Sequence, residues 1–243
     1  MLTLEKHGID TTLMQRIGGV PTSATILNVR PSGERPALHA RGASDHFDIA
    51  PETYDRVFAA PIVHLGGTGL LAKLDGPRSA EILREAKARG RTTTWDLVGA
   101  RPETAKLVDP LLPHIDYFMP SIEEAEIMCG RSEPEDIARH YLDLGVTACV
   151  LTMGGEGVFF AHTDGTRLHA PAYDIEIVDT TGCGDAFDAG FIAALHHGMD
   201  LETGLRFAQA AAGLVAGGLG SDAGNVSYQH TIECMKTWNI KRG

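Results

Sequence analysis

Residues 179–191 read Asp-Thr-Thr-Gly-Cys-Gly-Asp-Ala-Phe-Asp-Ala-Gly-Phe and join a strand-like run to a helix-like run. The preceding residues 175–178, Ile-Glu-Ile-Val, are rich in β-branched side chains and predict a strand, whereas apolar residues at helical spacing over 187–195 predict a helix. Gly182 and Gly184 let the connecting turn adopt backbone conformations that other residues avoid. Successive N–H groups can then converge, with the positive end of the helix dipole, on one anion. The stretch therefore predicts a phosphate site at a helix N-terminus.

Asp185 stands in the first turn of the predicted helix, beside that anion. A carboxylate at this position can cap the helix by accepting backbone N–H groups. It can also take a proton from a hydroxyl group that attacks a bound phosphoryl group. Both interpretations stay open on these residues alone, because an Asp that only caps an ordinary strand-to-helix turn would have the same sequence.

The pattern Asp-Thr-x-Gly-x-Gly-Asp, followed by a helix of small residues, resembles the C-terminal signature of the ribokinase family, the phosphofructokinase-B-type (PfkB) carbohydrate kinases. The resemblance implies that Asp185 is the catalytic base and that the amides of Gly182, Cys183 and Gly184 form the anion hole. Cys183 stands where the family usually has Ala or Gly. The family often binds a monovalent cation such as K⁺ beside the anion hole, which here implicates Asp179 and the carbonyl group of Thr181.

Composition limits the kind of protein. A chain of 243 residues with 43% hydrophobic content can bury a full core, and we expect one α/β domain over residues 1–243. The net charge of −11 argues against nucleic acid or an anionic membrane as a partner, since either would repel the protein. The four cysteines form no Cys-x-x-Cys pair, and no apolar run has the length of a signal peptide or a membrane span. We therefore expect a cytoplasmic protein without a zinc site or a disulfide framework.

Residues 22–45 predict a two-stranded ribbon. The strand-like runs 22–29 and 37–40 flank Pro31-Ser32-Gly33-Glu34, whose Pro and Gly favour a turn. In the resembled family such a ribbon is part of a small β-lid over the sugar, and the following Gly42-Ala43-Ser44 matches a stretch near the substrate. The alternative is a surface hairpin without contact to a ligand.

From residue 57 onward strand-like and helix-like segments alternate, which predicts a mostly parallel sheet with helices on its faces. With the resemblance, the expected fold is the ribokinase-like three-layer α/β/α arrangement. The strand-like run 62–65 leads into Gly66-Gly67-Thr68-Gly69, which we interpret as a loop that lines the sugar site through Gly66 and Gly67. Ribokinases carry an acid near this loop that holds ribose, so the glycines place ribose in doubt. Asp96 ends the next strand, at the edge of the sheet where ligands usually bind.

Ser121 and Glu124 open a helix after a strand-like run at 115–119, and their spacing has two interpretations. Ser followed by Glu three residues later is a capping box, which satisfies helix-end donors without any ligand. The same spacing matches the family's Asn-x-x-Glu motif, in which the Glu helps to hold Mg²⁺ near the nucleotide phosphates. Ser121 departs from that motif. We retain Glu124 as a Mg²⁺ group, because carboxylate oxygen suits this ion.

Two further segments resemble the nucleotide site of the family. The all-apolar run 148–151 predicts a strand that is covered on both faces, and a Thr-x-Gly-x-x-Gly turn follows it. The Ala-rich part of a second helix, which Asp200 would cap, permits close approach of a flat adenine or, equally, close helix packing. The implied ATP-binding residues are Ser121, Thr152, Gly154, Gly157, Gln209, Ala210 and Gly213.

These patterns together predict an ATP-dependent sugar kinase that uses Mg²⁺ and acts on a small-molecule sugar. One alternative is a nucleotide- or sugar-binding regulator with weakened catalysis, and another is a kinase of the same fold for a nucleoside or a vitamin precursor. Family members begin with a central strand, an acidic sugar contact and a Gly-Gly-x-x-x-Asn stretch, which residues 1–60 lack. We therefore interpret the domain as N-terminally incomplete. An unpaired sheet edge invites association, so we expect a homo-oligomer that binds ATP weakly and works slowly.

Overall fold

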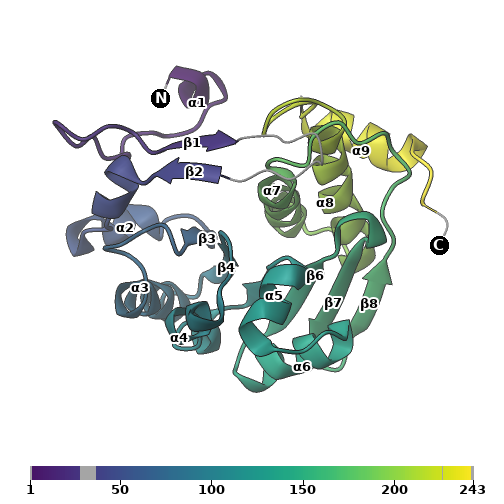
Figure 1. Ribbon diagram of the computed structural model, residues 1–243, viewed down its shortest axis with the longest axis horizontal. Coiled ribbons are helices and arrows are strands. Elements are labelled where there is room, and N and C mark those ends of the chain that lie inside the picture. Colours follow the sequence, from purple (N-terminus) through teal and green to yellow (C-terminus); the bar gives the residue numbers. More distant parts are fainter. Residues whose placement is uncertain (1, 28–36, 226, 242–243) are drawn as a thin grey trace.

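The computed structural model describes residues 2–27, 37–225 and 227–241. Its centre is a six-stranded sheet with the order β3-β4-β5-β6-β7-β8, in which β3 to β6 are parallel and β7 and β8 are antiparallel (Figure 1). The strands are β3 (Ile62–Thr68), β4 (Thr92–Leu97), β5 (Tyr117–Phe118), β6 (Ala148–Thr152), β7 (Val158–His162) and β8 (Arg167–Ala170). The predicted mostly parallel sheet is thus confirmed.

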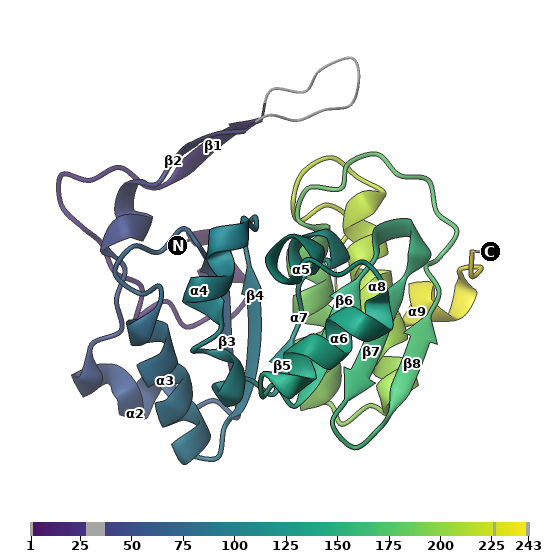
Figure 2. The same cartoon turned by 60° about the horizontal axis from the view of Figure 1, so that its bottom comes forward.

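Helices cover both faces of this sheet (Figure 2). One face carries α3 (Pro77–Ala88), α4 (Ala105–Val108), α5 (Ile122–Cys129) and α6 (Pro134–Asp143). The other face carries α7 (Cys183–His196) and α8 (Leu201–Ala216), and α9 (Tyr228–Thr237) packs on α8. The remaining short helices are α1 (Leu2–Lys6), α2 (Tyr54–Val57) and 3-10 turns at Gly42–His46, Pro51–Thr53, Pro102–Thr104, Leu112–His114 and Gly154–Glu156. This is the expected three-layer α/β/α fold.

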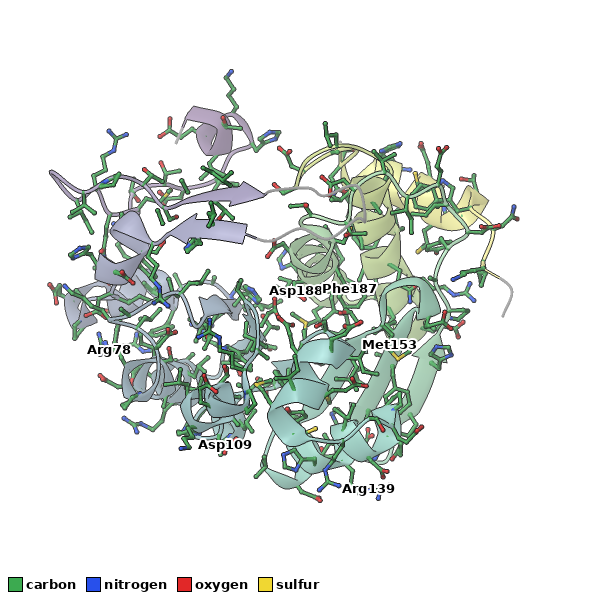
Figure 3. All side chains as sticks on the ribbon, viewed as in Figure 1. Arg78, Asp109, Arg139, Met153, Phe187 and Asp188 are labelled. Carbon is green, nitrogen blue, oxygen red and sulfur yellow. The ribbon has the colours of Figure 1, made fainter. Side chains whose placement is uncertain are left out.

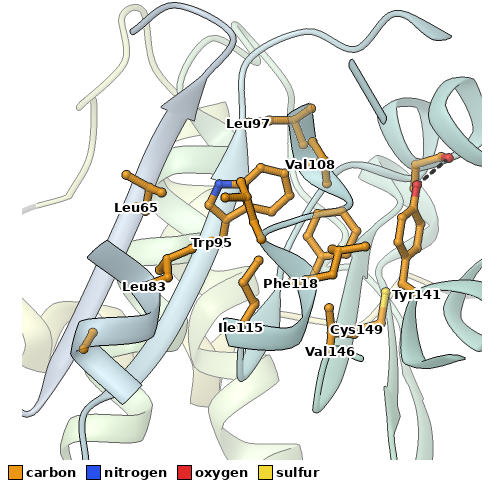
Figure 4. Packing of buried hydrophobic residues seen from close by; sticks show 14 of the residues in the cluster. Leu65, Leu83, Trp95, Leu97, Val108, Ile115, Phe118, Tyr141, Val146 and Cys149 are labelled. Carbon is orange, nitrogen blue, oxygen red and sulfur yellow. Dashed lines mark hydrogen bonds between the residues drawn. The ribbon is translucent and has the colours of Figure 1, made fainter. Parts of the chain in front are cut away.

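Two apolar clusters hold the layers together, and they differ in extent. The larger cluster lies between the sheet and α3 to α6, where Trp95 stacks on Phe118 and Tyr141 meets Phe118 edge-on with ring centroids 4.6 Å apart (Figure 4). Burial of each such side chain contributes roughly 1.5–3 kcal/mol. The smaller cluster lies under α7 and α8, and among the described residues it contains no residue of β3 or β4. The two halves of the sheet therefore differ on the face toward α7.

Helix α7 lies close to α8 because small residues face each other across the pair. A Cβ atom on Gly190 would come within 2.8 Å of the Ala208 Cα, so no larger residue fits at position 190. Phe187 and Phe191, at helical spacing on α7, are buried in the smaller cluster. This packing fixes the axis of α7, and with it the position of the turn at its N-terminus.

The predicted two-stranded ribbon forms and projects from the body of the protein (Figure 2), and its role as a lid stays a prediction. Strands β1 (Ala24–Leu27) and β2 (Ala37–Ala40) pair antiparallel in a sheet of their own. The turn predicted at 31–34 lies outside the described residues. Gly42 follows the ribbon with φ 51°, and a Cβ atom there would lie 2.3 Å from the carbonyl oxygen of Pro21. Gly42, Ala43 and Ser44 thus form a tight turn at the base of the lid.

Two local predictions are wrong. Residues 175–178 form no strand, because the amides of Val178 and Asp179 donate to the carbonyl oxygen of Ala216, at the end of α8, rather than to a neighbouring strand. Gly66 and Gly67 are not a loop but belong to β3, whose register with β4 shifts between Leu65 and Thr68. The two glycines form an irregularity within the strand, in which Gly67 has φ 79°, and pairing with β4 resumes at Thr68.

Candidate active site

The turn before α7 has the geometry of an anion site. Gly182, at the N-cap, has a left-handed conformation with φ 82°, and a Cβ atom there would lie 2.7 Å from Ser221. Only glycine therefore fits at this position. Gly184 faces open space, since a Cβ atom on it would meet no atom within 4 Å. The amides of Cys183, Gly184 and Asp185 belong to the first turn of α7, where N–H groups have no acceptor within the helix. The amide of Cys183 donates to the carbonyl oxygen of Thr180 in a long bond of 3.3 Å.

Asp185 and Asp179 have different surroundings on this turn. Asp185 is exposed in the first turn of α7, so its carboxylate can meet a ligand. Asp179 is committed to the loop, because its Oδ1 accepts from the amide and the hydroxyl of Thr181 at 3.0 and 2.8 Å. Its Oδ2 accepts from the amide of Gly220 at 3.3 Å. Asp179 therefore shapes the turn in which Thr181 lies, and the cation predicted there stays a prediction.

A cavity of about 220 Å³ opens beside the anion turn. Its walls come from the end of β6, the extended segment before α7, and the facing sides of α7 and α8. The predicted nucleotide residues that line it, together with two residues of the turn, are Thr152, Gly154, Gly157, Gln209, Gly213, Cys183 and Gly184. Of the other predicted residues, Ala210 is fully buried and Ser121 forms a β-bridge with Thr152. The structure therefore brings five of the seven ATP candidates into one cavity.

Gln209, which lines this cavity, has an acceptor without a partner in the described part of the chain. Its side chain is 8% exposed, and its Nε2 donates to the carbonyl oxygen of Ala170 at 2.7 Å. Its Oε1 is buried and has no hydrogen-bond partner among the described residues. A buried acceptor without a donor is costly, so a ligand with an amino group suits this wall. A Cβ atom on Gly213 would lie 2.8 Å from the ring of Trp238, so this small residue is also required by packing.

Glu124 joins two segments at the mouth of the site. Its Oε2 accepts from the amide and the hydroxyl of Ser121 at 3.1 and 2.9 Å, and its Oε1 accepts from the amide of Gly99 at 2.9 Å. Ser121 in turn accepts from the amide of Glu124, which completes the capping box. The described residues contain no group of three or more His, Cys, Asp and Glu that could hold a metal ion. Mg²⁺ needs no such group, since it binds through one or two carboxylates, waters and phosphates.

Asp188 is a polar residue of the site that the sequence did not single out. It lies on α7 next to Phe187 (Figure 3), three residues after Asp185, and is 4% exposed. Its carboxyl group hydrogen-bonds with that of Asp96 at the end of β4. Burial raises the pKa of both carboxyl groups, and the negative charges of the pair and of Asp185 and Glu124 add to this. The pair therefore holds a proton around neutral pH. The sequence did hold a signal for Asp188, because an acid between Phe187 and Phe191 falls on the buried side of the helix.

With this geometry in view, the comparisons identify the family. Residues 1–227 match the pfkB family carbohydrate kinases, and the chain belongs to this family. It is 35% identical to a ribokinase of Bacillus subtilis over 96% of this chain and 75% of that protein. It is 28% identical to a ribokinase of Haemophilus influenzae and 27% identical to a 2-dehydro-3-deoxygluconokinase of Thermoproteus tenax, over 95% and 96% of this chain. The chain spans 74% of the length of each of these two relatives.

Solved structures share the fold at low sequence identity. A ribokinase of Giardia lamblia superposes with a TM-score of 0.82 at 19% identity, over 97% of this chain and 77% of that chain. An Arabidopsis thaliana ribokinase, complexed with ribose and ATP, has a TM-score of 0.77 at 21% identity over 90% and 70%. A putative ribokinase II of E. coli, in complex with ATP and Mg²⁺, has a TM-score of 0.76 at 22% identity over 90% and 72%. In the part of the chain described here, no helix is long and apolar enough to span a membrane.

Proposed function

We propose that this chain is an ATP-dependent sugar kinase, which transfers the γ-phosphoryl group of ATP to a hydroxyl group of a sugar or sugar acid. The observation that carries the proposal is the exposed Asp185 in the first turn of α7, beside an anion turn that opens into a cavity with an unpaired acceptor. Family membership, and relatives named for ribokinase and 2-dehydro-3-deoxygluconokinase activity, support the same class of reaction.

In this proposal each residue of the turn has one task. Asp185 accepts the proton of the sugar hydroxyl as that oxygen attacks the phosphoryl group in line. The amides of Gly182, Cys183 and Gly184, at the positive end of α7, stabilise the negative charge on the phosphoryl oxygens. Such donors lower an activation barrier by about 3 kcal/mol each when they are well placed. Gln209 and the glycines of the cavity wall bind the adenine ring of ATP, since the amide oxygen of Gln209 can accept from its amino group.

ATP supplies the transferred group, and Mg²⁺ supplies positive charge that the phosphates require. Glu124 would hold Mg²⁺ directly or through water, because three donors leave lone pairs on its two oxygens. Asp179 and the carbonyl group of Thr181 would hold K⁺. Gly42, Ala43 and Ser44, at the base of the lid, together with Gly66 and Gly67 on β3, would lie along the sugar. We further propose a cytoplasmic homo-oligomer as the working form.

The decisive experiment is transfer of ³²P from γ-labelled ATP across a panel of sugars, sugar acids and nucleosides, with and without Mg²⁺. We expect label on a sugar or a sugar acid, and no label with the Asp185→Asn variant. Tight sugar and ATP binding without transfer in the parent protein would instead support the regulator. Label on a nucleoside alone would overturn the substrate class while leaving the kinase assignment intact.

A further inference from the structure

A strip of polar side chains runs along the N-terminal strands on the face toward α7. In β4, Thr94 and Asp96 lie on either side of Trp95, whose ring is in the large apolar core. Side chains alternate between the faces of a strand, so Thr94 and Asp96 point the other way, and Asp96 reaches Asp188 on α7. His64 of β3 pairs in register with Thr94 and hydrogen-bonds to it, which places the imidazole on the same face.

The hydrogen bond to Thr94 decides which nitrogen of His64 carries the proton. Nδ1 of His64 lies 2.9 Å from the Thr94 hydroxyl oxygen, and Thr94 is fully buried. A buried hydroxyl group must donate its hydrogen, and Nδ1 is its one acceptor within the described part of the chain. Nδ1 therefore accepts, and in the neutral ring the proton sits on Nε2. The His64 side chain is exposed on the strand, yet desolvation by the surrounding residues lowers its pKa against the opposing effect of Asp185, which favours this neutral ring.

Gly66 sets where the Nε2–H group lies. A Cβ atom on Gly66 would come within 2.8 Å of Nε2, so the ring occupies the space that a side chain at position 66 would fill. The backbone of Gly66 is not left-handed, so glycine here leaves space for the ring as it stands and does not serve a special conformation. The charge of Asp185 acts on the same ring. Thr94, which holds His64, lies two residues before Asp96, and Asp96 meets Asp188 one turn of α7 beyond Asp185. His64 and Asp185 therefore lie on the same side of the sheet.

We propose that His64 is a specificity-determining residue whose Nε2–H donates a hydrogen bond to the substrate, next to the hydroxyl group that Asp185 deprotonates. The inference rests on the proposed kinase function and names its substrate class. A neutral imidazole N–H group donates and does not accept, so it suits a substrate oxygen that only accepts. The preferred substrate is therefore a sugar with a keto or carboxylate oxygen at this point, and a plain aldose such as ribose is disfavoured.

Two variants distinguish the effect of the hydrogen-bond donor on His64 from the effect of the size of its ring. His64→Leu removes the donor and keeps an apolar side chain, whereas His64→Gln keeps an N–H group within similar reach. We expect His64→Leu to raise KM for the sugar at least tenfold with KM for ATP unchanged, and His64→Gln to restore KM to within about threefold. His196→Leu is the matched control, because His196 is exposed at the far end of the helix that carries Asp185. Melting temperatures of all variants report folding.

Isothermal titration with 2-dehydro-3-deoxygluconate and with D-ribose, without ATP, separates this inference from the kinase proposal. We expect the parent protein to bind the sugar acid at least tenfold more tightly than ribose, and His64→Leu to lose that preference. Binding with this pattern but without phosphoryl transfer would overturn the kinase and retain the role of His64. An unchanged affinity in His64→Leu, a preference for ribose, or binding of neither probe by the parent protein would overturn the inference.

Discussion

The C-terminal half of the molecule (β5–β8 with α5–α9) and the N-terminal half (β1–β4 with α1–α4) share one sheet but differ on the face toward α7. In the C-terminal half this face is apolar, and side chains such as Val150 and Phe160 pack on Phe191 of α7. In the N-terminal half the same face carries His64 and Thr94 and contributes nothing, within the described residues, to that cluster. The opposite face is apolar in both halves.

The difference indicates that the two halves of the sheet contact a ligand in different ways. In the C-terminal half the ligand surface is formed mostly by backbone and small residues, which accept a flat apolar group and bind phosphate through N–H groups. In the N-terminal half polar side chains stand on rigid strands, where their direction is fixed and can select among polar groups of a ligand. Asp185 lies at the N-terminal end of α7, which packs on β-strands of the C-terminal half through Phe191 and meets Asp96 of the N-terminal half through Asp188.

The strongest test of this difference is Asp185→Asn. Loss of the base should lower kcat by roughly 10²- to 10⁴-fold, while the affinity for ATP changes by a few fold, because the amide keeps the shape of the turn. Initial rates and a nucleotide titration measure the two quantities. Asp200→Asn is the control, since Asn caps α8 as well as Asp does. A kcat within tenfold of the parent would show that Asp185 is not the base.

Gly182→Ala tests whether the backbone geometry of the turn before α7 determines the affinity for ATP. The new Cβ atom would lie 2.7 Å from Ser221 at φ 82°, so the turn must shift and its amides move away from the phosphate. We expect ATP to bind on the order of tenfold more weakly, which corresponds to about 1.4 kcal/mol. Gly198→Ala, at φ 65° with no atom within 4 Å of the new Cβ, has the backbone strain without the collision. Equal ATP affinity in both variants would contradict the assigned anion turn.

Glu124→Gln separates the helix cap from the metal site. The amide oxygen of Gln keeps part of the capping box on Ser121 while the negative charge disappears. If Glu124 holds Mg²⁺, the Mg²⁺ concentration for half-maximal rate should rise several fold with a small change in melting temperature. A Mg²⁺ titration at fixed ATP gives this value. An unchanged Mg²⁺ requirement would leave Glu124 as a link between α5 and the loop after β4.

Asp188→Asn tests the acid pair that joins the two halves, and its effect is on stability. An acid whose pKa is raised by folding binds its proton more tightly in the folded state, so the parent loses stability as pH rises above about 4, the ordinary carboxyl pKa. Asn keeps a hydrogen bond to Asp96 without that loss. The variant should melt higher than the parent at pH 8, by roughly 2–4 °C for each kcal/mol recovered, and show a flatter pH profile. If the melting temperatures of the parent and the variant fell in parallel as pH rises, the acid pair would not hold a proton.

Much of the C-terminal half could be predicted from sequence, because its signals are local. The glycines and the helical spacing around Asp185 predict α7, and Asp200 marks the start of α8. The same reasoning failed at residues 175–178, where the side chains of Ile175 and Ile177 line a cavity wall and the segment forms no strand. Strand propensity reports a half-buried extended segment, whatever its hydrogen-bond partners are.

The N-terminal half could be predicted less well, because its interactions are distant in the sequence. The orientation of His64 depends on its hydrogen bond to Thr94, thirty residues later in the sequence. The protonation of Asp96 depends on Asp188, which lies on α7. Gly66 looked like part of a loop, although its role is to leave room for the ring of His64. No spacing rule links such residues before the topology is known.

The shortness of β5 has a consequence for the timing of motions. Tyr117 and Phe118 form two residue pairs with β4 and two with β6, and the flanking backbone of Asp116, Met119 and Pro120 adds a few hydrogen bonds to these strands. Segments that open together are those joined by many backbone hydrogen bonds, so the short strand β5 is a natural boundary between cooperative units. Amide protons of β3 and β4 should therefore exchange with deuterium as one group, at a rate distinct from that of β6 and β7. A sugar analogue would slow the first group, and a nucleotide the second.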